Sequence, residues 1–147
     1  MADSPSALAE AWAKNWSQSQ AAPWVALYTD SATYTDHAFC FKRSGRTSLT
    51  RHHEIWRESI PDFDMTIVHE WKLEGDRYTF RFRATGTFKK DLPQRKSTGK
   101  HFVMLGSVDF VVVEKEGKWF IDSVNEWYNP DFGEVSADDY RVISESS

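Results

Sequence analysis

The chain has 147 residues, the size of one domain with a single hydrophobic core. Acidic residues outnumber basic ones by 22 to 18, and this mild negative charge argues against nucleic acid or an anionic membrane as the main partner. Cys40 is the single cysteine, and the chain has neither a signal-peptide pattern nor a run of about 18 apolar residues, so we expect a cytoplasmic protein without disulfides or membrane spans.

The first predicted element is an amphipathic helix that begins at Ser4 and Pro5. Serine is a favoured N-cap, and proline is well tolerated at the first helical position. Leu8, Trp12 and Trp16 follow at spacings of four residues. This spacing places three large apolar side chains on one helix face, which we expect to pack on a sheet.

A second, shorter helix is predicted to open at Pro23, to include Tyr28 and to end at Asp30. Residues 32–39 are rich in strand-forming types and are interpreted as a strand that leads into a loop at residues 40–45.

A third helix is predicted over residues 46–60, because apolar residues recur there at spacings of three and four before Pro61. Two strands are expected at residues 65–73 and 78–88, joined by a Gly-Asp turn. The basic segment 89–98 has no periodicity and is expected to be a loop that could act as a lid.

The clearest pattern is a long β-hairpin at residues 100–115 and 118–128, whose arms are rich in β-branched and aromatic residues and are joined by a charged turn with glycine. We expect one domain over residues 1–132 and an acidic, Ser-rich, partly disordered tail over residues 133–147.

Helices interleaved with one early strand, followed by four antiparallel strands, indicate an α+β domain with its helices on one face of a strongly bent sheet. Seven Trp, five Tyr and ten Phe exceed what a minimal core needs. Some of them could line a cavity on the concave face, although rich core packing is the commoner explanation.

Several short motifs stand in a set order between roughly residues 8 and 132. They are WVALYTD at 24–30, Gly45-Arg46, Pro61-Asp62-Phe63, GDRYTFRFRATGT at 75–87, STGK at 97–100, GKW at 117–119 and EWYN at 126–129. In this order they resemble the SnoaL-like polyketide cyclases.

The resemblance implies the cone-shaped α+β barrel of the nuclear transport factor two-like superfamily, in which a strongly curved, mainly antiparallel sheet has three helices over its concave face. This superfamily includes ketosteroid isomerase, scytalone dehydratase, limonene epoxide hydrolase and fungal isomerases, as well as binding and scaffold domains. The fold does not choose among these activities.

The last strand carries the first candidate catalytic residue, Glu126. By its position two residues before Tyr128 it resembles the pocket carboxylate of limonene epoxide hydrolase, although Asn129 stands where that family often has aspartate. Strand alternation then turns Asp122, Glu126 and Tyr128 inward together. A β-bulge would reverse this parity.

Asp36 is the second candidate catalytic residue, because the family often has an acid at this pocket mouth; its neighbour His37 is more simply an exposed loop histidine. On the third helix only one of two adjacent histidines should share the inner face, and we choose His53, three residues before Trp56. A helical histidine is still more often a core residue than a catalyst.

The aromatic face of residues 78–82 is expected to point inward, which leaves Arg81 and Arg83 outside; with the face reversed, an arginine could anchor a substrate oxygen. Besides the catalytic candidates, the residues expected to bind substrate are Tyr34, Trp56, Phe80, Met104, Asp122 and Tyr128.

We therefore hypothesise a cofactor-independent isomerase or cyclase acting on a small, hydrophobic, oxygenated polyketide, terpenoid or alkaloid intermediate. Glu126 or Asp36 would move a proton while His53 or Tyr34 hydrogen-bonds the oxyanion. Histidine and cysteine spacings give no metal motif, and no cofactor motif is present.

Dehydration or epoxide opening would use the same groups, and the rival hypothesis is a non-catalytic ligand-binding or dimerisation domain. Apolar and charged residues mix on the outer strand faces, which suggests a homodimer through the sheet.

Overall fold

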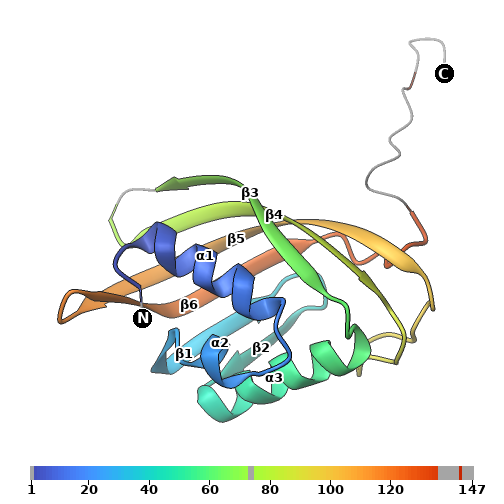
Figure 1. Cartoon of the computed structure of the whole chain (residues 1–147), viewed down its shortest axis with the longest axis horizontal. Coiled ribbons are helices and arrows are strands. Elements are labelled where there is room, and N and C mark those ends of the chain that lie inside the picture. The colour runs from blue at the N-terminus through green and yellow to red at the C-terminus, as the bar shows by residue number, and fades with distance from the viewer. Residues whose placement is uncertain (1, 73–74, 136–142, 144–147) are drawn as a thin grey trace.

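A computed structural model describes residues 2–72, 75–135 and 143 of the chain. Figure 1 shows three helices lying across one side of a single sheet. The helices are α1 (Pro5–Trp16), α2 (Ala22–Val25) and α3 (Arg46–Ser59). The strands are β1 (Tyr28–Asp36), β2 (Phe41–Ser44), β3 (Asp64–Lys72), β4 (Arg77–Thr87), β5 (His101–Lys115) and β6 (Lys118–Tyr128).

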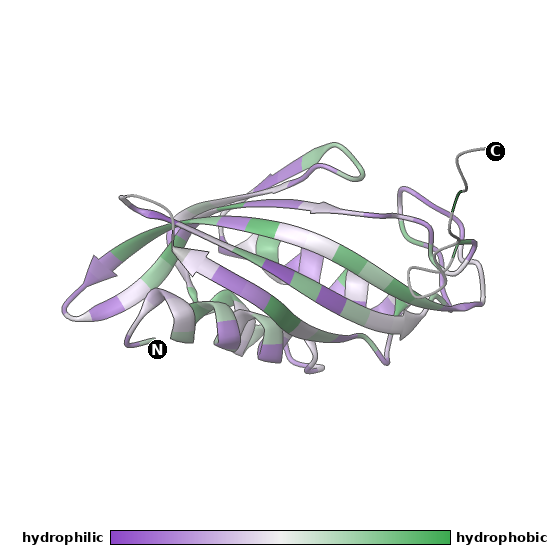
Figure 2. Ribbon diagram, turned by 90° about the horizontal axis from the view of Figure 1, so that it is seen from above, coloured by the Kyte–Doolittle hydropathy of each residue, from purple (hydrophilic) through white to green (hydrophobic). Residues whose placement is uncertain are grey.

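The sheet has the strand order β2-β1-β6-β5-β4-β3, so it is open, with β2 and β3 at its edges. All neighbours pair antiparallel except β1 and β6, which run parallel. Figure 2 shows the sheet bending around the helices, which all lie on its concave side. The predicted α+β class, with helices over a curved and mainly antiparallel sheet, is confirmed.

Helix α1 begins where the sequence predicts. The Ser4 side chain accepts a hydrogen bond from the Ala7 backbone N–H at 3.0 Å, and Pro5 occupies the first helical position. Trp12 is fully buried, and its indole N–H donates to the Tyr28 hydroxyl at 2.7 Å. This bond fixes the helix to β1.

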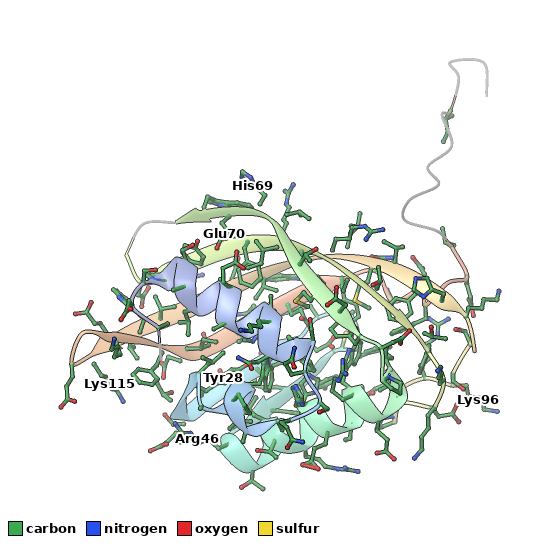
Figure 3. The ribbon with its side chains drawn as sticks, in the orientation of Figure 1. Tyr28, Arg46, His69, Glu70, Lys96 and Lys115 are labelled. Carbon is green, nitrogen blue, oxygen red and sulfur yellow. The ribbon has the colours of Figure 1, made fainter. Side chains whose placement is uncertain are left out.

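Edge strand β3 is held to the start of α1. Glu70 accepts hydrogen bonds from the Ser6 hydroxyl at 3.2 Å and from the Tyr78 hydroxyl at 2.9 Å. In Figure 3 Glu70 points toward α1, whereas His69, one residue earlier, points away from the molecule. Successive side chains of β3 therefore point alternately toward α1 and toward solvent.

The segment between α1 and α3 differs from the prediction. Helix α2 has four residues and ends at Val25, and Tyr28 already belongs to β1. The predicted loop 40–45 contains β2, which pairs with β1 from Thr33↔Ser44 to Asp36↔Phe41. A strand of four residues has too short an alternation to be recognised in a sequence.

Helix α3 and the long hairpin match their predictions. Gly45, with a φ of 82°, precedes α3, and the helix ends one residue before Ile60. Strands β5 and β6 meet at Glu116 and Gly117, whose positive φ angles of 52° and 78° are those of a two-residue hairpin turn that follows the sheet twist.

Phe132, after the last strand, belongs to the core. It is buried, stacks on Phe39 and packs at a tilt against Phe88. The expected disorder of the tail falls mainly on residues 136–142 and 144–147, outside the described residues, as does part of the predicted turn before β4. Among the described residues, no helix combines the length and the apolarity needed to cross a bilayer.

Candidate active site

A narrow cavity lies between α1, α3 and the concave face of the sheet. About 260 Å³ of space there is not filled by atoms, including a part that is open to solvent, but the centre of a water molecule could move through only about 10 Å³, which is room for one water. Ten side chains line it: Trp16, Asp36, His52, Trp56, Phe63, Met65, Phe82, Met104, Glu126 and Tyr128. Two carboxyl groups and one imidazole thus share an otherwise mostly apolar pocket.

Glu126 lies on β6, is 6 % exposed and faces this cavity, as its position before Tyr128 predicts. Burial, with a further contribution from the nearby Asp36 carboxylate and some opposition from the Tyr34 hydroxyl, raises the pKa of Glu126 to about 8. Glu126 is therefore mainly protonated at neutral pH and becomes a base of unusual strength when it ionises.

Asp36 is also buried in the cavity wall, but it is well supplied with donors. One carboxylate oxygen accepts from the Phe39 backbone N–H at 2.7 Å, and the other accepts from the Tyr128 hydroxyl at 2.6 Å. Burial raises the pKa of Asp36, while these hydrogen bonds lower it. The donors favour the ionised form, so the two carboxyls differ in their readiness to hold a proton.

The parallel pairing of β1 and β6 explains why the acids meet. Asp36 and Glu126 are register partners in this ladder, as are Tyr34 and Val124 two residues earlier. Residues 90 positions apart in the sequence thereby come side by side on one face of the sheet. No local sequence pattern indicates this strand pairing, so the proximity of Asp36 and Glu126 could not be predicted from the sequence.

Tyr34 is fully buried next to the acids but does not line the cavity. Its hydroxyl lies close enough to Glu126 to affect the pKa of that group, yet among the described residues it has no hydrogen-bond partner of good geometry. A small shift of either side chain would complete this bond.

The histidine chosen from the sequence is not the one that lines the cavity. His53 is buried elsewhere: its Nε2 lies 3.0 Å from the Asn15 carbonyl oxygen, and its ring stacks on Trp16. His52 faces the cavity instead, and burial, with the charge of Arg43 added, lowers its pKa to about 3. His52 is thus a neutral imidazole, and among the described residues its ring nitrogens have no hydrogen-bond partner.

Both histidines are buried because α3 is covered on two sides: His52 contacts Tyr34 of β1 and Phe41 of β2, and His53 stacks on Trp16 of α1.

Of the residues expected to bind substrate, three line the cavity: Trp56, Met104 and Tyr128. Two do not, Phe80 and Asp122. Phe80 points inward from β4, as expected, and packs in the core against Trp12 and Phe110.

Asp122 is displaced by an irregularity in the β5–β6 pairing. Val111 pairs with Ser123 whereas Val112 pairs with Ile121, so Asp122 is an extra residue on β6 and the inward face changes there. Its carboxylate accepts from the Thr29 hydroxyl at 2.8 Å, outside the cavity.

Gly106 on β5 gives the cavity part of its shape. A Cβ at this position would lie 2.2 Å from the Phe82 ring and 2.8 Å from the Trp127 carbonyl oxygen. Because Gly106 has no side chain, the Phe82 ring can lie over this position and line the cavity. Four further lining residues could not be told from core residues in the sequence, and only the fold places them at the cavity: Trp16, Phe63, Met65 and Phe82.

Within the described part of the chain, no group of three or more His, Cys, Asp or Glu side chains could hold a metal ion. The cavity offers a strong base, a second carboxylate held ionised, and a neutral imidazole. These groups can remove a proton from an apolar substrate and hydrogen-bond the oxygen on which charge develops.

A curved sheet that holds acid and base groups under three helices defines the class of nuclear transport factor two-like α+β proteins. The SnoaL-like domain model matches residues 9–120, and the chain belongs to this family. Among curated proteins, none matches the sequence significantly.

Solved structures share the fold at low identity. A hypothetical protein with a ketosteroid isomerase-like fold from Catenulispora acidiphila has a TM-score of 0.71 and 20% identity, over 91% of this chain and 97% of its own. A candidate polyketide cyclase from Pseudomonas putida has a TM-score of 0.68 and 15% identity, over 90% and 95%. PrhC from Penicillium brasilianum also reaches 0.68, with 15% identity over 84% and 78%.

Proposed function

We propose that this protein is an isomerase or cyclase that works by general acid–base catalysis without a cofactor, on a small hydrophobic substrate with a carbonyl or similar oxygen. The observation that carries the proposal is Glu126: a carboxyl group with a pKa of about 8, at the wall of an apolar cavity and beside Asp36. Structural neighbours named as cyclase and isomerase-like proteins support the same reaction class.

In the proposed reaction, ionised Glu126 takes a proton from a carbon next to the substrate carbonyl. The electron pair of the broken C–H bond moves toward the carbonyl oxygen and gives an enolate. His52, as a neutral N–H donor, stabilises that oxygen, while the Tyr34 hydroxyl supports Glu126 from behind the cavity wall. Glu126 then returns the proton to a different carbon, which completes an isomerisation. In a cyclisation, the enolate carbon instead attacks a second carbonyl carbon of the substrate, and the oxygen of that carbonyl takes the electron pair and then the proton from Glu126.

Asp36 has a positioning role in this scheme. Held by Tyr128 and the Phe39 N–H, it keeps its charge near Glu126 and so keeps the base strong. We place the substrate among oxygenated polyketide, terpenoid or alkaloid intermediates, in keeping with the family. Dehydration and epoxide opening are related outcomes that use the same groups.

Isomerisation of 3-cyclohexenone to 2-cyclohexenone tests the proposal, because it requires the same proton transfer and its conjugated product absorbs in the ultraviolet. We expect the wild type to accelerate the reaction and Glu126→Gln to lower kcat/KM by at least about 100-fold with the fold intact by circular dichroism. Glu114→Gln, an exposed carboxyl at the end of β5, is the matched control and should keep the wild-type rate.

The rival candidate is a non-catalytic ligand-binding domain, and the narrowness of the cavity favours it, since an open volume of about 10 Å³ requires side chains to move before any substrate enters. A wild type no faster than buffer, or a Glu126→Gln variant as fast as the wild type, would support this rival and contradict the enzyme.

A further inference from the structure

A second cavity lies beyond the wall of the first and is as narrow: about 260 Å³ is unfilled, including a part that is open to solvent, but the centre of a water molecule could move through only about 10 Å³. His52 and Trp56 line both cavities, so their two side chains separate one space from the other. The remaining lining comes from β2 and the turn before it, from α3 and from the 89–98 loop: Phe39, Phe41, Arg43, Ile55, Leu92, Pro93 and Gln94.

The loop side of this cavity is held in place. The Thr98 hydroxyl donates to the Phe132 carbonyl oxygen at 2.7 Å, and Arg95 pairs with Glu134 at 2.9 Å. Leu92 is buried between these anchors and α3. The segment expected to be a lid therefore forms a fixed wall of the second cavity.

Arg43 is the one cationic side chain that lines this space among the described residues. Its Nη1 is occupied, because it donates to the carbonyl oxygen and the hydroxyl of Ser48, both at 3.2 Å. Its Nε is buried and has no hydrogen-bond partner, and within the described ranges its Nη2 has none either. Nε and Nη2 form the side of the guanidinium that binds both oxygens of a carboxylate at once.

The surroundings of Arg43 leave its charge uncompensated. No carboxylate pairs with it in the described part of the chain, and the nearest charged influence is another cation, Arg51. The Cζ of the guanidinium also lies 5.8 Å from the centre of the Phe41 ring, within the range of a cation–π contact. A buried N–H without a partner costs free energy that a bound anion would recover.

We propose that the second cavity is a subsite for the carboxylate end of the substrate, bound by the Nε and Nη2 of Arg43. Resting on the proposed function, this assigns a substrate class: an elongated apolar acid whose carboxylate lies at Arg43 and whose carbonyl segment passes His52 and Trp56 to reach Glu126. Those two side chains must rotate to join the cavities when such a substrate binds.

The test compares phenylacetate with phenylacetamide, which share their shape and differ in charge. Binding is followed by calorimetry and by the Arg43 Nε–H signal of ¹⁵N-labelled protein. We expect phenylacetate to bind at least tenfold more tightly than the amide and to shift this signal. Arg43→Gln should remove the preference, Arg43→Lys should restore part of it, and Arg51→Gln, the nearby control, should change it less than twofold.

Equal binding of the two probes by the wild type, no binding of phenylacetate at millimolar concentration, or an unshifted Arg43 signal would each overturn the subsite. The signal is measured on the wild type, so the test does not depend on the variants folding. Glu126→Gln should keep the preference for phenylacetate, so loss of the subsite and loss of catalysis are separate results.

Discussion

Glu126 and Asp36 are two acids in one pocket that differ in their hydrogen bonds. Asp36 has two donors, whereas Glu126 has burial and a neighbouring negative charge acting on it. The protein therefore keeps one carboxyl ionised and the other protonated at neutral pH, which is how a single site acquires both a charge and a proton carrier.

This arrangement makes stability depend on pH. The folded-state pKa of Glu126, about 8, lies above its ordinary value of 4.5, so between these values the folded protein binds more protons than the unfolded chain. The stabilisation is complete below about pH 4.5 and is lost as pH rises through 8. We expect the free energy of unfolding of the wild type to fall by about 1 kcal/mol per pH unit over this range, relative to Glu126→Gln.

Urea unfolding of both proteins at a series of pH values measures this difference. The variant keeps Asp36, so whatever that acid contributes cancels in the comparison. Two curves that run parallel between about pH 5 and 8 would show that Glu126 titrates normally in the folded protein.

At the residue scale, the resemblance to the family allowed Glu126 and Asp36 to be proposed, because each stands where relatives carry a pocket acid. The sequence could not separate His52 from His53, since adjacent positions on a helix covered on two sides are both buried. The bulge at Asp122 was also hidden, because the pairing of Val111 and Val112 with β6 carries no sequence signature.

Among the elements, β5 determines the shape of the cavity through Gly106. Its hydrogen atom leaves space for the Phe82 ring, and an added methyl group would meet that ring at 2.2 Å and the fixed carbonyl oxygen of Trp127 at 2.8 Å.

Gly106→Ala should therefore lower the free energy of unfolding by about 3 kcal/mol, because neither neighbour can move without disturbing the core. Denaturant unfolding measures the effect. Ser107→Ala, the next residue on the same strand, should change stability by less than about 1 kcal/mol. A Gly106→Ala variant as stable as its control would mean that the Phe82 ring does not lie over Gly106.

Helices α1 and α3 and the β5–β6 hairpin could be predicted from the sequence, because each has a cap, a periodicity or a turn of its own. The parallel pairing of β1 with β6 could not. It joins Asp36 to Glu126 across the chain and depends on the whole sheet. The site is therefore less predictable than the elements that build it.

For the whole molecule, the convex face of the sheet has apolar side chains without cover in the single chain. Leu105 is 36 % exposed, and Trp127 is 44 % exposed and stacks on His37 at 4.4 Å. We propose that this face joins two copies of the protein, as the mixed outer faces of the strands suggest.

Sedimentation velocity at micromolar concentration tests the dimer. The wild type should sediment as a dimer, and Leu105→Glu, which places a charge in the middle of the apolar area, should shift it to monomer without unfolding it. A wild type that stays monomeric at all concentrations, or a variant that still dimerises, would exclude this face.

The account depends most on the state of one carboxyl group, and ¹³C NMR of glutamate-labelled protein observes it directly. The Glu126 signal, assigned by its absence in Glu126→Gln, should titrate with a midpoint near pH 8. A midpoint near pH 4.5 would show an ordinary surface-like carboxylate and would contradict the proposed base.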